Sequence, residues 1–370
     1  MNSKYYGMLK FLRKSSLMRR RFTLPVKFIK SKFWKSESYF PEMPSHKSRF
    51  RIFCELMGHI VKYGSIEWYY FAYGFDIKGF RDKRDYVDES YYFWKSSMIN
   101  TVFPDWDYTC ILRDKNLFSE ILTMWHYATP HVVFNVQNRQ DADHATEEML
   151  SKGGGYFCKP YDGQCGGGIF KVVVRDGQCQ IDGNEMEIQN AKSVIYEKLS
   201  SAHYLVQTLV EQHPMLDKIY DKSINTLRLT TVYDKKNDTI VPFTAFFRTG
   251  VNGAVMDNWA TGGLLITVDL ETGELSDIGW YKHGVGTTTT NHPNSKIPFK
   301  GVKLPYYEEA VRQAKELHYH LKNIAIIGWD IAFTPDGPLF IEGNDNIEIG
   351  PIQTIFEKGY KKELEKYFSF

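Results

Sequence analysis

The pattern of apolar and polar positions near the C-terminal end of the chain predicts a pair of antiparallel strands. Residues 326–344 read IIGWDIAFTPDGPLFIEGN, with apolar and β-branched residues on both sides of Pro335-Asp336-Gly337. Pro-Asp-Gly between apolar runs is typical of a hairpin loop, with glycine where a positive φ is needed. A three-residue loop sets these opposed pairs: Thr334 with Pro338, Phe333 with Leu339, and Asp330 with Glu342.

This register brings three oxygen-bearing side chains together. Side chains alternate between the two faces of a strand, so Asn344 lies on the same face as Glu342, which is opposite Asp330. Two carboxylates that face each other repel unless a cation or a proton lies between them. An all-oxygen group suits Mg²⁺, which usually shares its coordination shell with water and substrate phosphates. The alternative is an exposed hairpin with two solvated acids, which the apolar flanks disfavour.

From Asp114 to the C-terminal hairpin, the chain alternates between short apolar strands and amphipathic helices. Helices are predicted over 114–127, 191–201 and 306–322, the first with Asp114 as its N-cap. The expected strands cover 131–135, 156–159, 169–174, 204–210, 226–233, 240–248 and 264–269. Several antiparallel strands with a few helices indicate an α+β fold rather than a doubly wound parallel sheet.

The N-terminal third differs from the rest of the chain in composition and in its pattern of apolar residues. Residues 1–36 carry eleven lysines and arginines and no acid, interleaved with apolar residues. This segment is either an amphipathic helix on an anionic membrane surface or a basic, partly disordered arm. Residues 45–100 are rich in aromatics and predict helices, with a second helical pattern over 65–75. The first helical spacing is formed by Phe53, Leu56, Ile60 and Tyr63.

Composition narrows the class of protein. The 370 residues are 43% hydrophobic and 24% charged, as expected for a globular protein with a core, and the formal net charge of +2 gives no support for a nucleic-acid partner. Five scattered cysteines form no CxxC pair and no zinc spacing, which favours a reducing cytoplasm. No apolar run is long enough to cross a bilayer, and no secretory signal is recognisable.

A glycine-rich segment between two predicted strands is a candidate phosphate-binding loop. Residues 159–168 read KPYDGQCGGG. A Walker loop would precede a helix and end in GK[ST], so this segment is not a Walker loop. Glycines let backbone N–H groups approach phosphate oxygens, and Lys159 supplies a positive charge. The alternative is a mobile hairpin tip, and Cys165 has no evident base that would make it a nucleophile.

Two further patterns involve predicted strands. Residues 204–211, YLVQTLVE, form a strand whose backbone could read the edge of an adenine, although the same pattern also fits an ordinary core strand. Arg228 and Arg248 lie within apolar strands and need an anionic partner, because an unpaired buried charge is very costly. A triphosphate, a substrate carboxylate or a structural salt bridge to a strand acid would each serve.

The order of these elements resembles that of the ATP-grasp superfamily. The motifs that carry the resemblance are SINTLRLTT (223–231), WATGGLLITVDLETGEL (259–275) and IGWDIAFTPDGPLFIEGN (327–344). Within the superfamily the chain is most similar to the branch associated with bacterial polysaccharide and sugar-transfer gene clusters, over residues 110–355. The resemblance implies an α+β ATP-grasp fold, in which two α+β subdomains clasp ATP. The expected domains are a basic amphipathic arm (1–36), a helical N-terminal domain (37–110), the ATP-grasp domain (111–355) and a C-terminal helix (356–370).

The resemblance also implies a role for each matching position. Contacts to ATP phosphates or to the adenine face fall to Lys115 and Lys159, and the mobile loop would include Gly163, Gly166, Gly167 and Gly168. Adenine and ribose would be held by Gln207, Thr208, Val210 and Glu211. Mg²⁺ would be bound by Asp330, Glu342 and Asn344, and the transferred phosphoryl group or the acid substrate would be faced by Arg228 and Arg248, which act with Lys159 in catalysis. The chain departs from the family at Gln207, where the hinge often carries an acid.

The implied activity is that of an ADP-forming carboxylate–amine ligase in surface-polysaccharide or capsule synthesis, with ATP and Mg²⁺ as cofactors. A carboxylate would attack the γ-phosphate to give an acyl phosphate, and an amine would displace phosphate to form an amide. The same site also fits a kinase for a sugar or glycan, and a third hypothesis is a non-catalytic nucleotide-binding module at a membrane. The substrates would be a small acid and a small amine, sugar-linked, in the cytoplasm or at the inner face of the cell membrane.

Overall fold

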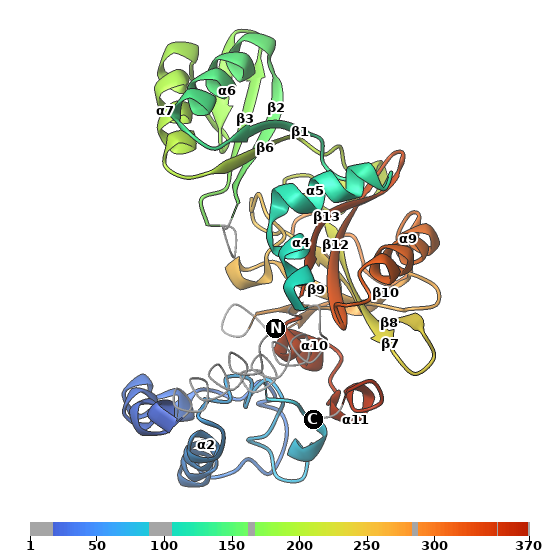
Figure 1. Ribbon diagram of the computed structural model, residues 1–370. Coiled ribbons are helices and arrows are strands. Elements are labelled where there is room, and N and C mark those ends of the chain that lie inside the picture. The colour runs from blue at the N-terminus through green and yellow to red at the C-terminus, as the bar shows by residue number, and fades with distance from the viewer. Residues whose placement is uncertain (1–17, 89–105, 162–166, 283–287, 346, 369–370) are drawn as a thin grey trace, which may run out of the picture.

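The computed structural model describes five stretches of the chain, which form three structural units (Figure 1). The described stretches are residues 18–88, 106–161, 167–282, 288–345 and 347–368. A helical N-terminal unit lies at one end, a sheet with two helices lies at the other, and a larger sheet lies between them. The α+β fold expected from the sequence is confirmed. Of the helices in the described stretches, none is both long enough and apolar enough to traverse a bilayer.

The smaller sheet packs two helices on one face. Its described strands run in the order β1-β6-β2-β3-β4-β5, and all neighbouring pairs are antiparallel. The strands are β1 (Val132–Val136), β2 (Gly154–Pro160), β3 (Phe170–Arg175), β4 (Gln178–Ile181), β5 (Asn184–Glu187) and β6 (Tyr204–Thr208). Helices α6 (Arg139–Lys152) and α7 (Ile188–Ser200) bury Ala145, Met149 and Ile195 against sheet residues such as Val172 and Val206. Helix α6 and strands β4 and β5 were not predicted from the sequence.

The larger sheet carries the C-terminal hairpin at one edge. Its described strands run in the order β11-β10-β9-β8-β7-β12-β13. They are β7 (Thr226–Asp234), β8 (Thr239–Thr249), β9 (Leu264–Val268), β10 (Leu275–Tyr281), β11 (Thr288–Thr289), β12 (Ile326–Thr334) and β13 (Gly337–Asn344), with the short helices α8 (Pro214–Asp217) and η4 (Trp259–Thr261) in the connections. Leu227 and Leu229 pack with helix α9 (Tyr307–His320) on one face. Val232 and Phe246 pack on the other face with helices α10 (Ile349–Ile355) and α11 (Lys361–Leu364).

A short helical segment packs on β13 of the larger sheet and precedes β1 of the smaller one. It consists of η3 (Trp106–Thr109), α4 (Cys110–Arg113) and α5 (Lys115–Met124), and the Asp114 carboxylate caps α5 by accepting from the N–H groups of Asn116 and Leu117. The N-cap predicted at Asp114 is therefore confirmed. A Cβ at Gly343 of β13 would lie 2.7 Å from Leu112 Cδ2, so a larger residue between Glu342 and Asn344 would require the Leu112 side chain of α4 to shift.

The N-terminal unit has a core of aromatic residues. A helix over 18–31 and helix α2 (Arg49–Tyr63) bury Phe28, Leu56 and Ile60, and the short helices η1 (Phe33–Lys35) and η2 (Lys83–Asp85) complete the unit. Residues 65–75 form turns instead of the second helix predicted there. Their apolar spacing arises because Tyr70, Phe71, Tyr73 and Phe75 all point into this core.

The side chain of Gln353 connects the N-terminal unit to α10. Its carbonyl oxygen accepts from the N–H of Val87 at 2.9 Å, and its amide donates to the Val87 carbonyl at 2.9 Å and to the Tyr73 hydroxyl at 2.8 Å. Gln353 has no exposed surface, so these bonds satisfy a buried amide. The C-terminal helix predicted over 356–370 is shorter than expected, because α11 spans Lys361–Leu364 and residues 356–360 form turns and coil.

Candidate active site

The hairpin of β12 and β13 places Asp330 opposite Glu342, as the sequence predicts, but by a different route. Thr334 pairs with Gly337 and Phe333 with Pro338, so the loop has two residues rather than three. A β-bulge between Asp330 and Ile331 then inserts one residue into β13 and restores the predicted pair. The predicted opposed pairs Thr334–Pro338 and Phe333–Leu339 are therefore wrong. The bulge lies directly beside the two acids, where it re-aims the side chains of the strand end.

Asp330 is the centre of a buried ion-pair network that spans three strands. Arg228 of β7 is its register partner and binds the carboxylate with two nitrogens, Nε to Oδ1 and Nη2 to Oδ2, the latter at 3.0 Å. Arg248 of β8 donates from Nη1 to Asp330 Oδ2 at 2.9 Å and from Nη2 to Asp257 Oδ1 at 3.0 Å. Thr226 donates to the other oxygen of Asp257. The two arginines thus have the anionic partners that their burial demands.

The charges of this network act in opposite directions on its two facing carboxyls. Burial alone would raise the pKa of Asp330, but the guanidinium groups of Arg228 and Arg248 overcome this and lower it. The pKa of Glu342 is raised, first by burial and then by the charge of Asp330 beside it. Lys159 and Arg228 partly offset that rise. Glu342 is therefore the member of the pair that gains most from a nearby cation.

Lys159 lies on the other sheet and interacts electrostatically with Glu342. It is the penultimate residue of β2 and is 5% exposed. Burial lowers its pKa to about 8, while the carboxylate of Glu342 raises it and the charge of Lys115 lowers it further. Lys115, the first residue of α5, donates from Nζ to the carbonyls of Pro160 at 3.3 Å and Tyr161 at 3.4 Å. The two lysines thus lie together where β2 leads into the glycine-rich loop.

Only part of that loop belongs to the described residues. Gly167 and Gly168 are exposed, Gly168 has a φ of +75°, and its carbonyl accepts from the Tyr204 hydroxyl at 2.9 Å. Gly163 and Gly166 lie outside the described residues, as does Cys165. Their predicted contacts with phosphate remain predictions.

The proposed adenine-binding strand ends where the two sheets are joined. Gln207 is buried and donates to the carbonyl of Pro130 at 3.2 Å, and the N–H of Thr208 donates to the carbonyl of His131 at 3.0 Å. These two groups therefore have partners within the fold. Val210 and Glu211 follow the end of β6, Val210 half-buried and Glu211 exposed, and their contacts with adenine and ribose remain predictions.

Asp330, Glu342 and Asn344, called here the acid trio although the third is an amide, have the oxygen ligands that fit a magnesium ion. Asn344 pairs with Gly328 and donates from Nδ2 to its carbonyl at 3.3 Å, an orientation that fixes the amide beside Glu342. Carboxylate and amide oxygens are the donors that Mg²⁺ prefers. The pKa of Glu342 is raised partly because the charge of Asp330 repels its ionised form. A divalent ion bound between the two carboxylates would reduce this repulsion. Asp330 would share its oxygens between the ion and the arginines.

Two acids near the trio were not singled out from the sequence. Asp257 pairs with Arg248, and Asp345, which directly follows Asn344, binds Arg113 of α4 at 3.1 Å from Nε and through a short Nη2 contact. The available signal for Asp257 was its position in the sequence, because it lies between Arg248 and the WATGG motif, both of which had been singled out.

Comparison with known proteins defines the class of this fold. The fold is that of an ATP-grasp protein, a class that binds ATP. The chain belongs to the family described as sugar-transfer associated ATP-grasp, whose model matches residues 97–367. A search of curated proteins finds no match.

Three solved structures with a similar arrangement are remote from this chain in sequence. D-alanyl-alanine synthetase A from Vibrio cholerae O1 biovar eltor is 12% identical, with a TM-score of 0.41 over 71% of this chain and 62% of that one. An N5-carboxyaminoimidazole ribonucleotide synthetase from Thermus thermophilus is 11% identical, with a TM-score of 0.42 over 76% and 60% of the two chains. An L-amino acid ligase from Bacillus licheniformis is 13% identical, with a TM-score of 0.36 over 66% and 43%. The chain thus spans less than two thirds of the length of each.

The lowered pKa of Lys159 predicts how nucleotide affinity depends on pH. In the free protein Lys159 loses its charge as the pH rises through about 8, and a neutral amine cannot pair with phosphate. Affinity for ADP without metal should therefore fall up to about tenfold between pH 7 and pH 9. Titration calorimetry of the unmutated protein and of Lys159→Met tests this. The variant should bind weakly at both pH values, and an equal pH dependence in the two proteins would contradict the assignment. Lys192→Met, on the exposed surface of α7, is the matched control.

Proposed function

We propose that this protein is an ATP-dependent carboxylate–amine ligase that works through an acyl phosphate. The observation that carries the proposal is the approach of Lys159, on one sheet, to Glu342, on the other, close enough for each to shift the pKa of the other. A nucleotide bound between the sheets would have its phosphates between this lysine and the acid trio. Arg228 and Arg248 lie on the acid side, where an anionic acceptor would sit.

The proposed chemistry has two steps. A carboxylate oxygen of the acid substrate forms a bond to the γ-phosphorus while the bond from that phosphorus to the β–γ bridging oxygen breaks, and ADP leaves with the electron pair. The amine nitrogen then attacks the carbonyl carbon, inorganic phosphate leaves, and the nitrogen releases one proton. Lys159, Arg228 and Arg248 would orient the reactants and neutralise their charge. Mg²⁺, held by Asp330, Glu342 and Asn344, would supply further neutralisation of the phosphate oxygens.

The family, rather than a pocket, supports the proposed substrate class. A sugar-transfer association supports an acid or an amine that is carried on a sugar. We infer that the enzyme joins an amine to a sugar acid, or an acid to an amino sugar, in surface-polysaccharide or capsule synthesis in the cytoplasm.

The products distinguish this ligase from the other hypotheses. Purified protein with Mg-ATP, a sugar acid and an amine should release ADP and phosphate in equal amounts and form an amide that is lighter than the two substrates together by one water. A phosphorylated acceptor without free phosphate would identify a kinase and contradict the ligase. ATP binding without turnover across a panel of acids and amines would identify a binding module. Mass spectrometry and a coupled ADP assay read out all three outcomes.

We also propose that the N-terminal helix contacts an anionic membrane surface. Met18, Phe22, Val26 and Ile29 are each more than half exposed, and in a helix they lie within about 80° of one another. A neighbouring face of the helix, about 80° from Met18 at the edge of this stripe, buries Phe28 in the aromatic core. An exposed apolar stripe on a helix that is anchored by a neighbouring face is typical of a helix lying in the lipid interface.

Basic residues border this stripe on both sides. Arg19 and Lys30 fall on one side. Arg21 falls on the other side, where its Nη2 donates to the carbonyl of Lys62 at 2.7 Å, and residues 18–35 contain no acid. Cations at the edges of an apolar stripe reach lipid phosphates while the stripe enters the interface. The charge pattern therefore favours an anionic lipid surface over a neutral one.

The buried Phe28 dictates how membrane contact should be tested. Deleting residues 1–36 would remove part of the aromatic core, so point variants are the cleaner experiment. Phe22→Asp with Val26→Asp should reduce co-sedimentation with phosphatidylserine-containing vesicles at least tenfold, with weak binding to phosphatidylcholine vesicles throughout. Met124→Asp, at an equally exposed site on α5, is the control. Equal sedimentation of the double variant and the unmutated protein would exclude this surface.

A further inference from the structure

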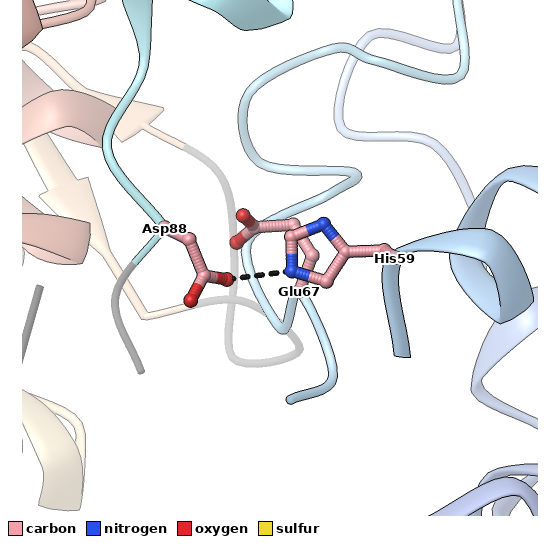
Figure 2. Close-up of side chains that lie close together, drawn as sticks. All are labelled: His59, Glu67 and Asp88. Carbon is pink, nitrogen blue, oxygen red and sulfur yellow. Dashed lines mark hydrogen bonds and ion pairs between the residues drawn. The ribbon is translucent and has the colours of Figure 1, made fainter. Parts of the chain in front are cut away.

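Three potential metal ligands converge in the N-terminal unit, outside the residues matched by the family model. They are His59 in the last turn of α2, Glu67 in the turn that follows, and Asp88 (Figure 2). One ligand atom from each lies within 4.8 Å of the other two. Among the described residues, no other group of three or more His, Cys, Asp or Glu side chains has such geometry. The ATP-grasp chemistry makes no use of it.

The fold positions these side chains before any ligand arrives. Gly64 ends α2 in the left-handed conformation, with a φ of 66°, and turns the chain so that Ser65 and Glu67 return toward His59. Ser65 donates to Asp88 Oδ1 at 3.2 Å, while His59 Nε2 lies 2.8 Å from Asp88 Oδ2. The His59 ring also packs on Tyr63, with centroids 4.7 Å apart. Hydrogen bonds and packing of this kind orient ligands in established metal sites.

Burial adds an electrostatic reason for a cation. Glu67 is 5% exposed, and the side chains of Asp88 and His59 are 8% and 18% exposed. Figure 2 shows the Glu67 carboxylate beside the imidazole, with Asp88 facing the same ring. Glu67 also accepts from the N–H of Tyr69 at 3.4 Å and interacts with the charge of Lys83, and a cation between Glu67 and Asp88 would add to this compensation.

We propose that His59, Glu67 and Asp88 bind a divalent transition-metal ion. One imidazole nitrogen and two carboxylate oxygens form a ligand set that suits Zn²⁺ or Mn²⁺ and leaves coordination positions open for water or a further ligand. Binding would replace the hydrogen bond between His59 Nε2 and Asp88 Oδ2 by a bond from each of these atoms to the ion, with the imidazole N–H on Nδ1.

The position of Asp88 gives the ion a structural role. Its neighbour Val87 is held by Gln353 of α10 through both its N–H and its carbonyl. An ion on Asp88 would therefore fix the segment that docks the N-terminal unit on the catalytic sheet, and its loss would loosen that contact.

Metal binding by the full-length chain tests the proposal directly. In the Glu342→Gln background, which weakens the catalytic site, EDTA-treated protein is dialysed against ZnCl₂ or MnCl₂ and its metal content is measured by mass spectrometry. We expect one bound equivalent, and at least about a hundredfold weaker binding after His59→Gln or Glu67→Gln. The matched control is His46→Gln, because His46 forms a comparable pair with Asp76, at 3.2 Å, in the same unit.

A second measurement needs no substitution at the site. X-ray absorption of the zinc-loaded protein should show one imidazole with oxygen ligands and no sulfur, and EDTA should lower the melting temperature of the Glu342→Gln protein. The proposal is overturned if no equivalent is retained, if His59→Gln and Glu67→Gln bind as well as His46→Gln does, or if the absorption spectrum lacks imidazole. In each of these cases the cluster is a hydrogen-bonded His–Asp pair only. Because these readouts involve no turnover, they are independent of the ligase assay.

Discussion

Replacing Glu342 by glutamine should reduce ATP turnover by about 10³-fold and leave the protein folded. The substitution removes one charge from the acid trio, and losing a group that stabilises transition-state charge costs on the order of 10²–10³ in rate. Because the Glu342 pKa is raised by burial and by Asp330, the carboxylate is destabilising when no cation is bound beside it, and the amide should match or exceed its stability. A coupled ADP assay and thermal unfolding measure the two effects.

The control for this variant lies on the same hairpin. Asp336→Asn changes an exposed acid in the loop between β12 and β13 and should leave turnover unchanged. A Glu342→Gln protein that turns over ATP at the rate of the Asp336→Asn protein would remove Glu342 from the site.

Replacing Arg248 by methionine should cause the largest loss of stability among these variants, about 3–5 kcal/mol. Arg248 joins Asp330 to Asp257, and its removal leaves two buried carboxylates short of a partner. The lowered pKa of Asp330 means that its stabilising effect is present above its unfolded pKa, which is about 3.9. This effect is lost as the pH falls through the lower folded value, so the deficit should be full at neutral pH and shrink in strong acid.

Urea unfolding at pH 7 and at pH 3 measures this deficit. Arg312→Met, which breaks an exposed pair with Glu316 on α9, should cost less than about 1 kcal/mol and is the control. Equal unfolding free energies for Arg248→Met and Arg312→Met at pH 7 would contradict the buried network.

The hairpin illustrates what the sequence can and cannot specify. The apolar runs and Pro335-Asp336-Gly337 were sufficient to predict two strands and the pair of Asp330 with Glu342. The loop is one residue shorter than predicted, which shifts the register by one residue. The bulge, which was not predicted, adds one residue to β13 and shifts the register back, so Asp330 still faces Glu342. A bulge depends on how the strand packs and twists, which alternation of side chains does not encode.

Other elements were missed because their local pattern is weak or misleading. Helix α6 buries Ala142, Ala145 and Met149, mostly small residues that give little periodic contrast against its many charges. Residues 65–75 have the apolar spacing of a helix but form turns, because tertiary packing of their aromatic rings outweighs local spacing.

The partners of the strand arginines could not be chosen from the sequence. The need of Arg228 and Arg248 for an anion was predicted, and within the fold Asp330 and Asp257 meet it. Arg228 and Arg248 are 102 and 82 positions from Asp330 in the sequence. Contacts over such separations depend on the order of the strands in the sheet, and no local sequence pattern predicts them. Whether the arginines also contact the transferred phosphoryl group remains a prediction.

A crystal structure with Mn²⁺ and a non-hydrolysable ATP analogue tests the central claim most directly. The anomalous signal of manganese should place the ion within about 2.3 Å of carboxylate or amide oxygens of Glu342 and Asn344, with Asp330 in its shell and the β- and γ-phosphates bridged by it. Lys159 should contact the same phosphates from β2. Manganese and phosphates bound away from β12 and β13 would contradict the account.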